Sequence, residues 1–481
     1  MESKVKKNYI YNLLSQLLTI IIPVITTPYI SRVLGAQAIG DFSYTTGIVS
    51  YFCMVAMLGT ANYAQREIAK KHESKNEVSS IFFEILSIRI IMIALVLVGY
   101  LFFLNLPSWR EYRILFSVQV ISFVAWGFDI TWLFQGLEKF KITAVRNSII
   151  KIISTILILL IVKKENDLIL YTIIYCASDL IGNLTMWPYL KGNVKTVEIK
   201  KLNFARHIKG IWELFIPNIA LQLYTVFDKT MLGALVNTLQ VGYYSQAEKI
   251  IKIILVVISS LFTVLLPRFA YLNDKGKNVE ANQYFITAVR YTYFLAIPMT
   301  LGCICVSDYF VPIFFGQGYG TVSPLMKILS MLFIVMSIEK LLGTVLIAYN
   351  KQNAYTMSVI VASIINISLN AFFICVLNLG AIGVAIASVI AEAIAMLVQL
   401  WYLPNNFQKK MVFFPCKNYF IAGIVMLLAL LGLNSLVMGN FGHLILNIVC
   451  GCLIYCAILI WLKDTMVINT ITKIKSKKYH G

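Results

Sequence analysis

The stretch WGFDITWLFQGLEKFKITAVRNSIIK, residues 126–151, contains two apolar segments joined by a short polar one. We predict two helices here, connected by an elbow with Gly136 at its corner. Asp129 lies within the first apolar segment and Lys151 within the second. If these helices cross a membrane, both charges are costly, so each needs water or a polar partner.

Apolar segments of this kind recur along all 481 residues. The chain is 59% hydrophobic and 13% charged, whereas soluble domains are about 45–50% apolar and about 25% charged. A helix needs about 20 apolar residues to cross a bilayer. We therefore predict an all-α polytopic membrane protein with about fourteen transmembrane helices. The predicted spans are residues 9–33, 39–63, 80–104, 112–134, 142–162, 168–190, 211–235, 241–267, 284–306, 322–349, 355–377, 381–403, 419–437 and 441–462.

The net charge of +19 indicates cytoplasmic loops rich in Lys and Arg rather than binding to nucleic acid. The basic residues gather in loops on one side of the predicted spans, and Lys163 and Lys164 are the clear exception. Both termini are therefore expected in the cytoplasm. The expected cytoplasmic tail carries Lys473, Lys475, Lys477 and Lys478. The apolar segment after the basic start lacks a small-residue cleavage site, so we interpret it as a span and not as a signal peptide.

No predicted loop is long enough for an extramembrane domain of about 50 residues or more. The nine cysteines lie mostly in apolar segments, and the four histidines are scattered. We therefore expect no metal site, no cofactor and no catalytic residues.

Two short sequence echoes predict an internal repeat, which is typical of transporters. AIGDFS at 38–43 resembles QVGYYS at 240–245, and this register places Arg66 opposite Arg268. A second echo pairs WLFQGLEK at 132–139 with VLIAYNKQ at 345–352. The predicted parts are a six-helix lobe at 1–190, a basic cytoplasmic connector at 191–210, a second six-helix lobe at 211–405, and two accessory helices with a basic tail at 406–481.

The charged residues within or near the predicted spans are the candidate functional residues. Each charge at the bilayer centre costs about 3 kcal/mol, so Arg89, Lys151 and Arg290 should face a water-filled cavity or pair with acids. The candidate substrate-binding residues are Arg66, Arg89, Arg146, Lys151, Lys252, Arg268 and Arg290. The candidate acids for coupling to an ion are Asp129, Asp179 and Glu392.

Structural alternatives remain open for several of these residues. Glu248 and Lys252 are four residues apart and could simply pair along one helix. Arg66 and Arg268 could instead anchor helix ends in anionic lipid headgroups.

The elbow sequence WLFQGLEKFKITAVRN, residues 132–147, resembles the signature of Wzx-type polysaccharide flippases. This family shares a superfamily with the lipid II flippase MurJ and the MATE exporters. The second half of the chain is similar to the same pattern at Asp228 and Lys229, at GYY in 242–244 and at LPR in 266–268.

The resemblance implies two pseudo-symmetric lobes around a central cationic cavity. It also implies a cargo, an oligosaccharide on undecaprenyl pyrophosphate, moved by alternating access from the inner to the outer leaflet of the bacterial cytoplasmic membrane. Arg side chains would hold the pyrophosphate through paired, charge-assisted hydrogen bonds. The implied partners are membrane lipids, a polysaccharide polymerase with other assembly proteins, and H⁺ or Na⁺ as a coupling ion.

Two other classes of protein are alternatives to a flippase. A MATE-like exporter of cationic small molecules would have the same fold, but its cavity should be rich in acids. Here the embedded bases equal or exceed the embedded acids. A membrane glycosyltransferase or polysaccharide polymerase would need a sizeable catalytic loop, which none of the predicted loops provides. The sequence therefore favours a flippase over an enzyme.

Overall fold

The computed structural model describes the backbone of residues 2–198, 200, 202–414, 416–436, 441–464 and 466–468. The side chains of residues 2–16, 214, 216–225, 261, 263–264, 416 and 435–436 are outside this description. The described part of the chain is helical and contains no β-strand. The predicted basic tail, with Lys473, Lys475, Lys477 and Lys478, lies outside the described residues.

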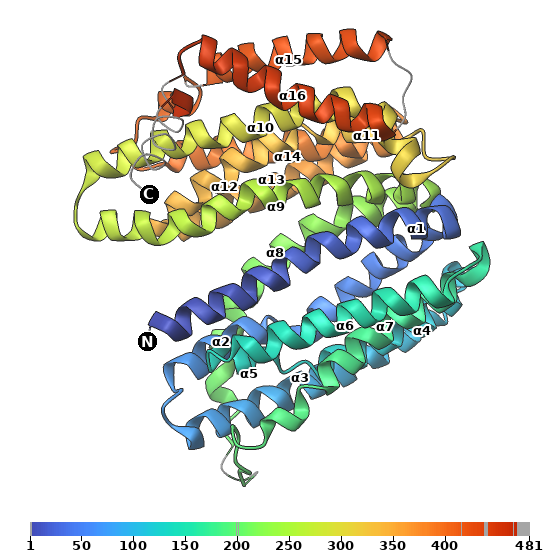
Figure 1. Cartoon of the computed structure of the whole chain (residues 1–481). Coiled ribbons are helices and arrows are strands. Elements are labelled where there is room, and N and C mark those ends of the chain that lie inside the picture. The colour runs from blue at the N-terminus through green and yellow to red at the C-terminus, as the bar shows by residue number, and fades with distance from the viewer. Residues whose placement is uncertain are drawn as a thin grey trace. The chain divides into compact units, whose positions relative to one another are not determined.

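The chain divides into two compact units, Met1–Gly242 and Tyr243–Gly481, and each is built from long helices (Figure 1). The helices of the first unit are α1 (Glu2–Met57), α2 (Thr60–Lys70), α3 (Lys75–Leu104), α4 (Arg113–Gly127), α5 (Thr131–Gly136), α6 (Phe140–Ile161), α7 (Leu168–Leu184) and α8 (Ala205–Leu235). Within this unit α4 packs on α7, and α6 packs on α1 and α7.

The second unit begins within α9 (Thr238–Asp274), which starts in the first. Its other helices are α10 (Asn278–Phe315), α11 (Val322–Leu329), α12 (Leu332–Ala348), α13 (Gln352–Ala371), α14 (Gly380–Tyr402), α15 (Cys416–Leu436) and α16 (Phe441–Trp461). α14 packs on α12 and α13, and the paired helices α15 and α16 both pack on α10 (Figure 1).

Every predicted span overlaps a helix, and twelve segments of the described chain are long and apolar enough to cross a membrane. The protein is therefore an all-α, multi-pass membrane protein, for which fourteen spans is an approximate count. The second predicted span and the first one from Leu17 onward lie in one segment, Leu17–Lys70. They separate at Gly35, whose φ of 76° and ψ of 172° suit glycine because it has no Cβ.

The boundary between the compact units differs from the predicted lobe boundaries, because α8 packs on α1 and α2 in the first unit. A compact unit is defined by the contacts within it, whereas a repeat is defined by sequence segments of common origin. The two boundaries therefore need not coincide. The six-plus-six arrangement of lobes thus stays a prediction.

The basic connector is held to the first unit by Glu84 of α3, a residue for which the sequence suggested no role. This buried carboxylate accepts hydrogen bonds from the backbone N–H of Asn203 at 2.7 Å and from Arg206 Nε at 2.9 Å. Its Oε2 also lies 2.6 Å from His207 Nε2. These contacts fix the start of α8 against α3.

The structure corrects our prediction for the elbow between α5 and α6. Gly136 is not its corner, because Glu138 takes the left-handed conformation, with φ of 57°. Gly136 instead permits close packing: a Cβ there would lie 2.8 Å from Ile68 Cγ2 and 2.9 Å from the Gln65 carbonyl oxygen of α2.

The same turn recurs between α12 and α13, in a register one residue different from the predicted echo. The Lys139 N–H donates to the Phe134 carbonyl at 2.7 Å, and the Lys351 N–H donates to the Leu346 carbonyl at 2.8 Å. Asn350, with φ of 56°, therefore corresponds to Glu138. The sequence echo aligned the two turns one residue out of register, because the turns share a backbone conformation and not a pattern of residue types.

Candidate functional site

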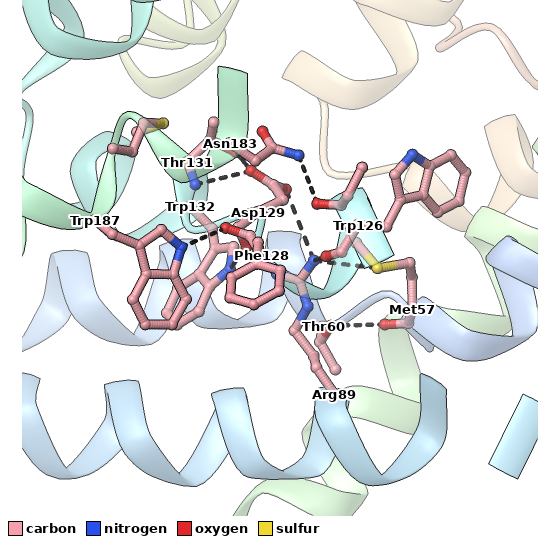
Figure 2. A network of polar contacts seen from close by, with 12 residues as sticks. Met57, Thr60, Arg89, Trp126, Phe128, Asp129, Thr131, Trp132, Asn183 and Trp187 are labelled. Carbon is pink, nitrogen blue, oxygen red and sulfur yellow. Dashed lines mark hydrogen bonds and ion pairs between the residues drawn. The ribbon is translucent and has the colours of Figure 1, made fainter. Parts of the chain in front are cut away.

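A break in the fourth predicted span, at residues 128–130, separates α4 from α5. Such a break frees backbone carbonyls, which need other donors at membrane depth. Two side chains near the end of α7 act as such donors (Figure 2). Asn183 Nδ2 donates to the Ala125 carbonyl at 2.6 Å, and Trp187 Nε1 donates to the Phe128 carbonyl at 2.9 Å.

Arg89 of α3 binds the same break from another direction (Figure 2). Its side chain is 0% exposed. Nη1 donates to the Asp129 carbonyl at 2.9 Å and Nη2 to the Trp126 carbonyl at 2.8 Å. Nη2 also lies 3.7 Å from Asp129 Oδ2, and the guanidinium stands 5.9 Å from the centroid of the Trp132 ring. The sequence predicts that Arg89 either faces a water-filled cavity or pairs with an acid. It is buried and pairs with Asp129.

The Asp129 carboxylate shapes the break and also reaches its surface. Oδ1 accepts hydrogen bonds from the Thr131 N–H at 3.0 Å and from Thr131 Oγ1 at 2.6 Å, which holds the first turn of α5. The side chain is nevertheless 21% exposed. Asp129 therefore places a carboxyl group at the point where the helix is interrupted.

A second break separates α1 from α2. Leu58 and Gly59 both have left-handed backbones, with φ of 48° and 67°. This conformation is uncommon for a residue with a side chain such as leucine. Thr60 Oγ1 donates to the freed Met57 carbonyl at 2.6 Å, and Arg89 Nη2 contacts Met57 Sδ at 3.1 Å. Arg89 therefore touches both breaks.

The two breaks line one cavity, with a volume of about 400 Å³. Pockets of this size hold small ligands. Its described lining consists of Met54, Met57, Gly59, Ala61, Asn62, Trp126, Asp129, Asp179, Asn183 and Phe215. The charged residues among these are two acids, Asp129 and Asp179, and the described lining includes no Lys or Arg. The cationic cavity implied between the lobes stays a prediction.

Arg146 and Lys151 of α6 interact electrostatically with Asp179, but other side chains hold their nitrogen atoms. Arg146 Nη2 lies 3.3 Å from Asn183 Oδ1 and 2.8 Å from Met186 Sδ. Lys151 Nζ donates to Thr19 Oγ1 of α1 at 2.9 Å. These two bases therefore offset the charge of Asp179 without belonging to the described cavity wall.

Arg66 and Arg268 are both exposed, in α2 and α9. Arg66 Nε lies 3.2 Å from Glu67 Oε1, and its guanidinium stands 5.5 Å from the Tyr63 ring centroid. Arg268 stands 5.6 Å from the ring centroid of Tyr271. Both guanidinium groups are accessible, as either pyrophosphate binding or headgroup anchoring would require.

In the second unit, the pairing of Lys252 with Glu248 is confirmed, with 2.5 Å between Nζ and Oε1. Arg290 is half-buried in α10 and interacts electrostatically with Tyr419 of α15. The Arg290 and Lys252 roles in substrate binding stay predictions.

The third candidate acid, Glu392 of α14, is buried and interacts electrostatically with Glu339 of α12. Gln399 Nε2 donates to Glu339 Oε1 and, at 3.0 Å, to Ser358 Oγ. The sequence analysis names Glu392 but not Glu339, so it does not predict this buried acid pair.

Sequence reasoning also missed Asn183, which contacts both the helix break and Arg146. A usable signal was its position one turn after Asp179 on α7, since residues four apart share a helix face. Within the described residues, no group of three or more His, Cys, Asp or Glu side chains is arranged to hold a metal ion.

These features first define a class: a multi-pass membrane protein with interrupted helices around a cavity that contains acidic and amide side chains, an arrangement typical of transporters. A more specific assignment follows from sequence comparison. The family described as "Polysaccharide biosynthesis protein" matches residues 5–273, more than half of the 481 residues, and the chain belongs to that family.

Similar proteins include two named "Putative O-antigen transporter". The one from Escherichia coli (strain K12) is 22% identical over 408 residues, which cover 83% of this chain and 97% of the relative. The one from Shigella dysenteriae is 24% identical over 400 residues, which cover 82% and 99%.

Solved structures show the same fold. The "Lipid II flippase MurJ, inward closed conformation" has a TM-score of 0.77 at 20% identity, covering 95% of this chain and 99% of that chain. An inward-facing multidrug resistance MATE family transporter of the MOP superfamily has a TM-score of 0.59 at 12% identity, covering 86% and 99%.

Proposed function

We propose that this protein is a flippase that moves oligosaccharide repeat units linked to undecaprenyl pyrophosphate across the bacterial cytoplasmic membrane, for polysaccharide biosynthesis. The observation that carries the proposal is the cavity of about 400 Å³ at two helix breaks, with two carboxylates and two amides in its wall, in a chain of the polysaccharide biosynthesis family. Such groups can hydrogen-bond a glycan, while its lipid tail can stay in the bilayer.

The proposed cycle is alternating access, in which a cavity opens first to the cytoplasm and then to the outside. Both termini lie in the cytoplasm, as the distribution of Lys and Arg favours. The exposed guanidinium groups of Arg66 and Arg268 receive the pyrophosphate. Asp129, Asp179 and Glu392 are the acids through which H⁺ or Na⁺ would drive the cycle, and a polysaccharide polymerase would take the product outside.

Deletion of the gene tests this function. We expect carrier-linked oligosaccharide to accumulate on the inner leaflet and surface polysaccharide to disappear, with both effects reversed by the wild-type gene. Liposomes containing the purified protein should also move a fluorescent lipid-linked oligosaccharide between leaflets faster than protein-free liposomes. Unchanged leaflet distributions in both experiments would exclude a flippase.

A second candidate is a MATE-like exporter of cationic small molecules. The specific observation in its favour is that Asp129 and Asp179 are the charged residues in the described cavity wall. Efflux of a cationic dye from cells that express the protein would support this alternative, and the gene deletion should then leave polysaccharide export intact.

A further inference from the structure

The wall of the first-unit cavity combines negative charge with polar and aromatic groups. Asp179 of α7 is exposed at this wall, and Asp129 contributes its partly exposed carboxylate. Asn62 adds an amide, and the half-buried Trp126 adds an indole with an apolar face and one N–H donor. The wall therefore offers acceptors to hydroxyl groups and an apolar surface to a ring.

Three neighbouring bases, Arg89, Arg146 and Lys151, offset part of the charge of the two acids, but none of them belongs to the described cavity wall. Arg89 is fully buried, and two of its nitrogen atoms already donate to the carbonyls of the helix break. Arg146 is directed to Asn183 and Met186, and Lys151 to Thr19. An anionic group entering the cavity would thus meet two carboxylates before it met a cation.

We infer that this cavity receives a sugar without a carboxylate, either neutral or amino-substituted, and discriminates against acidic sugars such as uronates. The inference rests on the proposed function and adds the chemical class of the glycan. Hydroxyl groups donate strong, charge-assisted hydrogen bonds to carboxylates. A uronate would instead place a like charge against Asp129 and Asp179, and such repulsion is an effective source of specificity.

Asp179 can be tested more cleanly than Asp129. Asp129 Oδ1 holds the first turn of α5, so changing it would disturb the break itself. Asp179→Asn keeps the size and an acceptor oxygen of the side chain but removes its charge. Glu111→Gln is the matched control, because Glu111 is an exposed acid of the same unit that is outside the described cavity wall.

The experiment measures binding of two polyprenyl pyrophosphate disaccharides to the purified full chain in nanodiscs. One carries two glucose residues, and the other carries two glucuronic acid residues. We expect the wild-type chain to bind the glucose compound at least about tenfold more tightly. Asp179→Asn should narrow this ratio, mainly by improving binding of the glucuronic acid compound, whereas Glu111→Gln should leave the ratio unchanged.

Equal binding of the two compounds by the wild-type chain would overturn the inference while leaving the flippase function in place. An unchanged ratio in folded, monodisperse Asp179→Asn would also overturn it. Failure of the wild-type chain to bind either compound would instead count against the proposed function.

Discussion

At the scale of single residues, Arg89 shows how a buried charge can be structural. Its guanidinium contacts two carbonyls of the α4–α5 break, the Met57 sulfur of the α1–α2 break and the face of Trp132. A planar group with several fixed donors can make these contacts together, whereas an ammonium group is a compact point charge. We therefore assign Arg89 to the support of the cavity and not to its wall.

Replacement of Arg89 by lysine should destabilise the protein by about 2 kcal/mol, because hydrogen bonds to charged groups contribute about 1.5–3 kcal/mol. Thermal unfolding of the detergent-purified protein would measure the loss. The control is Arg113→Lys, since Arg113 is exposed at the start of α4. Equal unfolding temperatures for Arg89→Lys and Arg113→Lys would show that the contacts of Arg89 are dispensable.

Arg66 and Arg268 allow a test of pyrophosphate binding at the same scale. Arg66→Lys and Arg268→Lys should each reduce polysaccharide export markedly, and the alanine variants should abolish it, because lysine cannot form the paired hydrogen bonds of a guanidinium. Export is measured in deletion cells at equal protein level. Wild-type export in both lysine variants would favour headgroup anchoring, which lysine provides about as well.

At the scale of elements, the position of α5 depends on the space available beside α2. A Cβ at Gly136 would lie within 3 Å of both a side chain and a backbone oxygen of α2, and the backbone oxygen cannot move without the helix. Glycine is therefore required here for packing, while the turn that follows depends on Glu138.

Gly136→Ala should therefore destabilise the protein by about 1–3 kcal/mol, the usual cost of overpacking. Gly99→Ala in α3 is the matched control, because a Cβ there meets nothing within 4 Å. Gly99→Ala should be as stable as the wild type or slightly more stable, because alanine lowers the conformational entropy of the unfolded chain. The two variants would be compared by thermal unfolding, and equal stability would contradict the packing argument.

At the scale of the whole molecule, the two units have the same elbow, between α5 and α6 and between α12 and α13. The breaks between α1 and α2 and between α4 and α5 have no counterpart at the equivalent positions of the second unit. In the register of the first echo, Leu58 and Gly59 correspond to residues 260–261, which lie inside the continuous helix α9. In the register of the elbows, residues 128–130 correspond to 340–342, inside the continuous helix α12. The cavity is therefore a feature of the first unit, and the repeat alone does not predict it.

The membrane topology is testable at this scale too. Reporter fusions after Lys195 in the connector and after Gly481 should both report the cytoplasm, because cytoplasmic loops of membrane proteins are enriched in Lys and Arg. A fusion after Ser108, between α3 and α4, should report the outside. An outside signal at Lys195 or Gly481 would reverse the predicted orientation.

The positions of the helices could be predicted because each depends on a local run of apolar residues. The breaks could not, since the donors that stabilise the α4–α5 break lie about 40–60 residues away, on Arg89, Asn183 and Trp187. The sequence did single out Asp129 and Asp179 as embedded acids. It could not show that they line one cavity while Arg146 and Lys151 are held by other side chains.

The side chains that complete the α4–α5 break also impose an order on its assembly. Arg89 is synthesised before the break, whereas Asn183 follows Ala125 by 58 residues and Trp187 follows Phe128 by 59. At about 5–20 residues per second, synthesis needs about 3–12 s to cover that distance. During that interval the nascent chain lacks two of the donors for its interrupted helix. Arrival of α7 is thus the step at which this part of the newly made protein can leave the insertion machinery with its backbone polar groups satisfied.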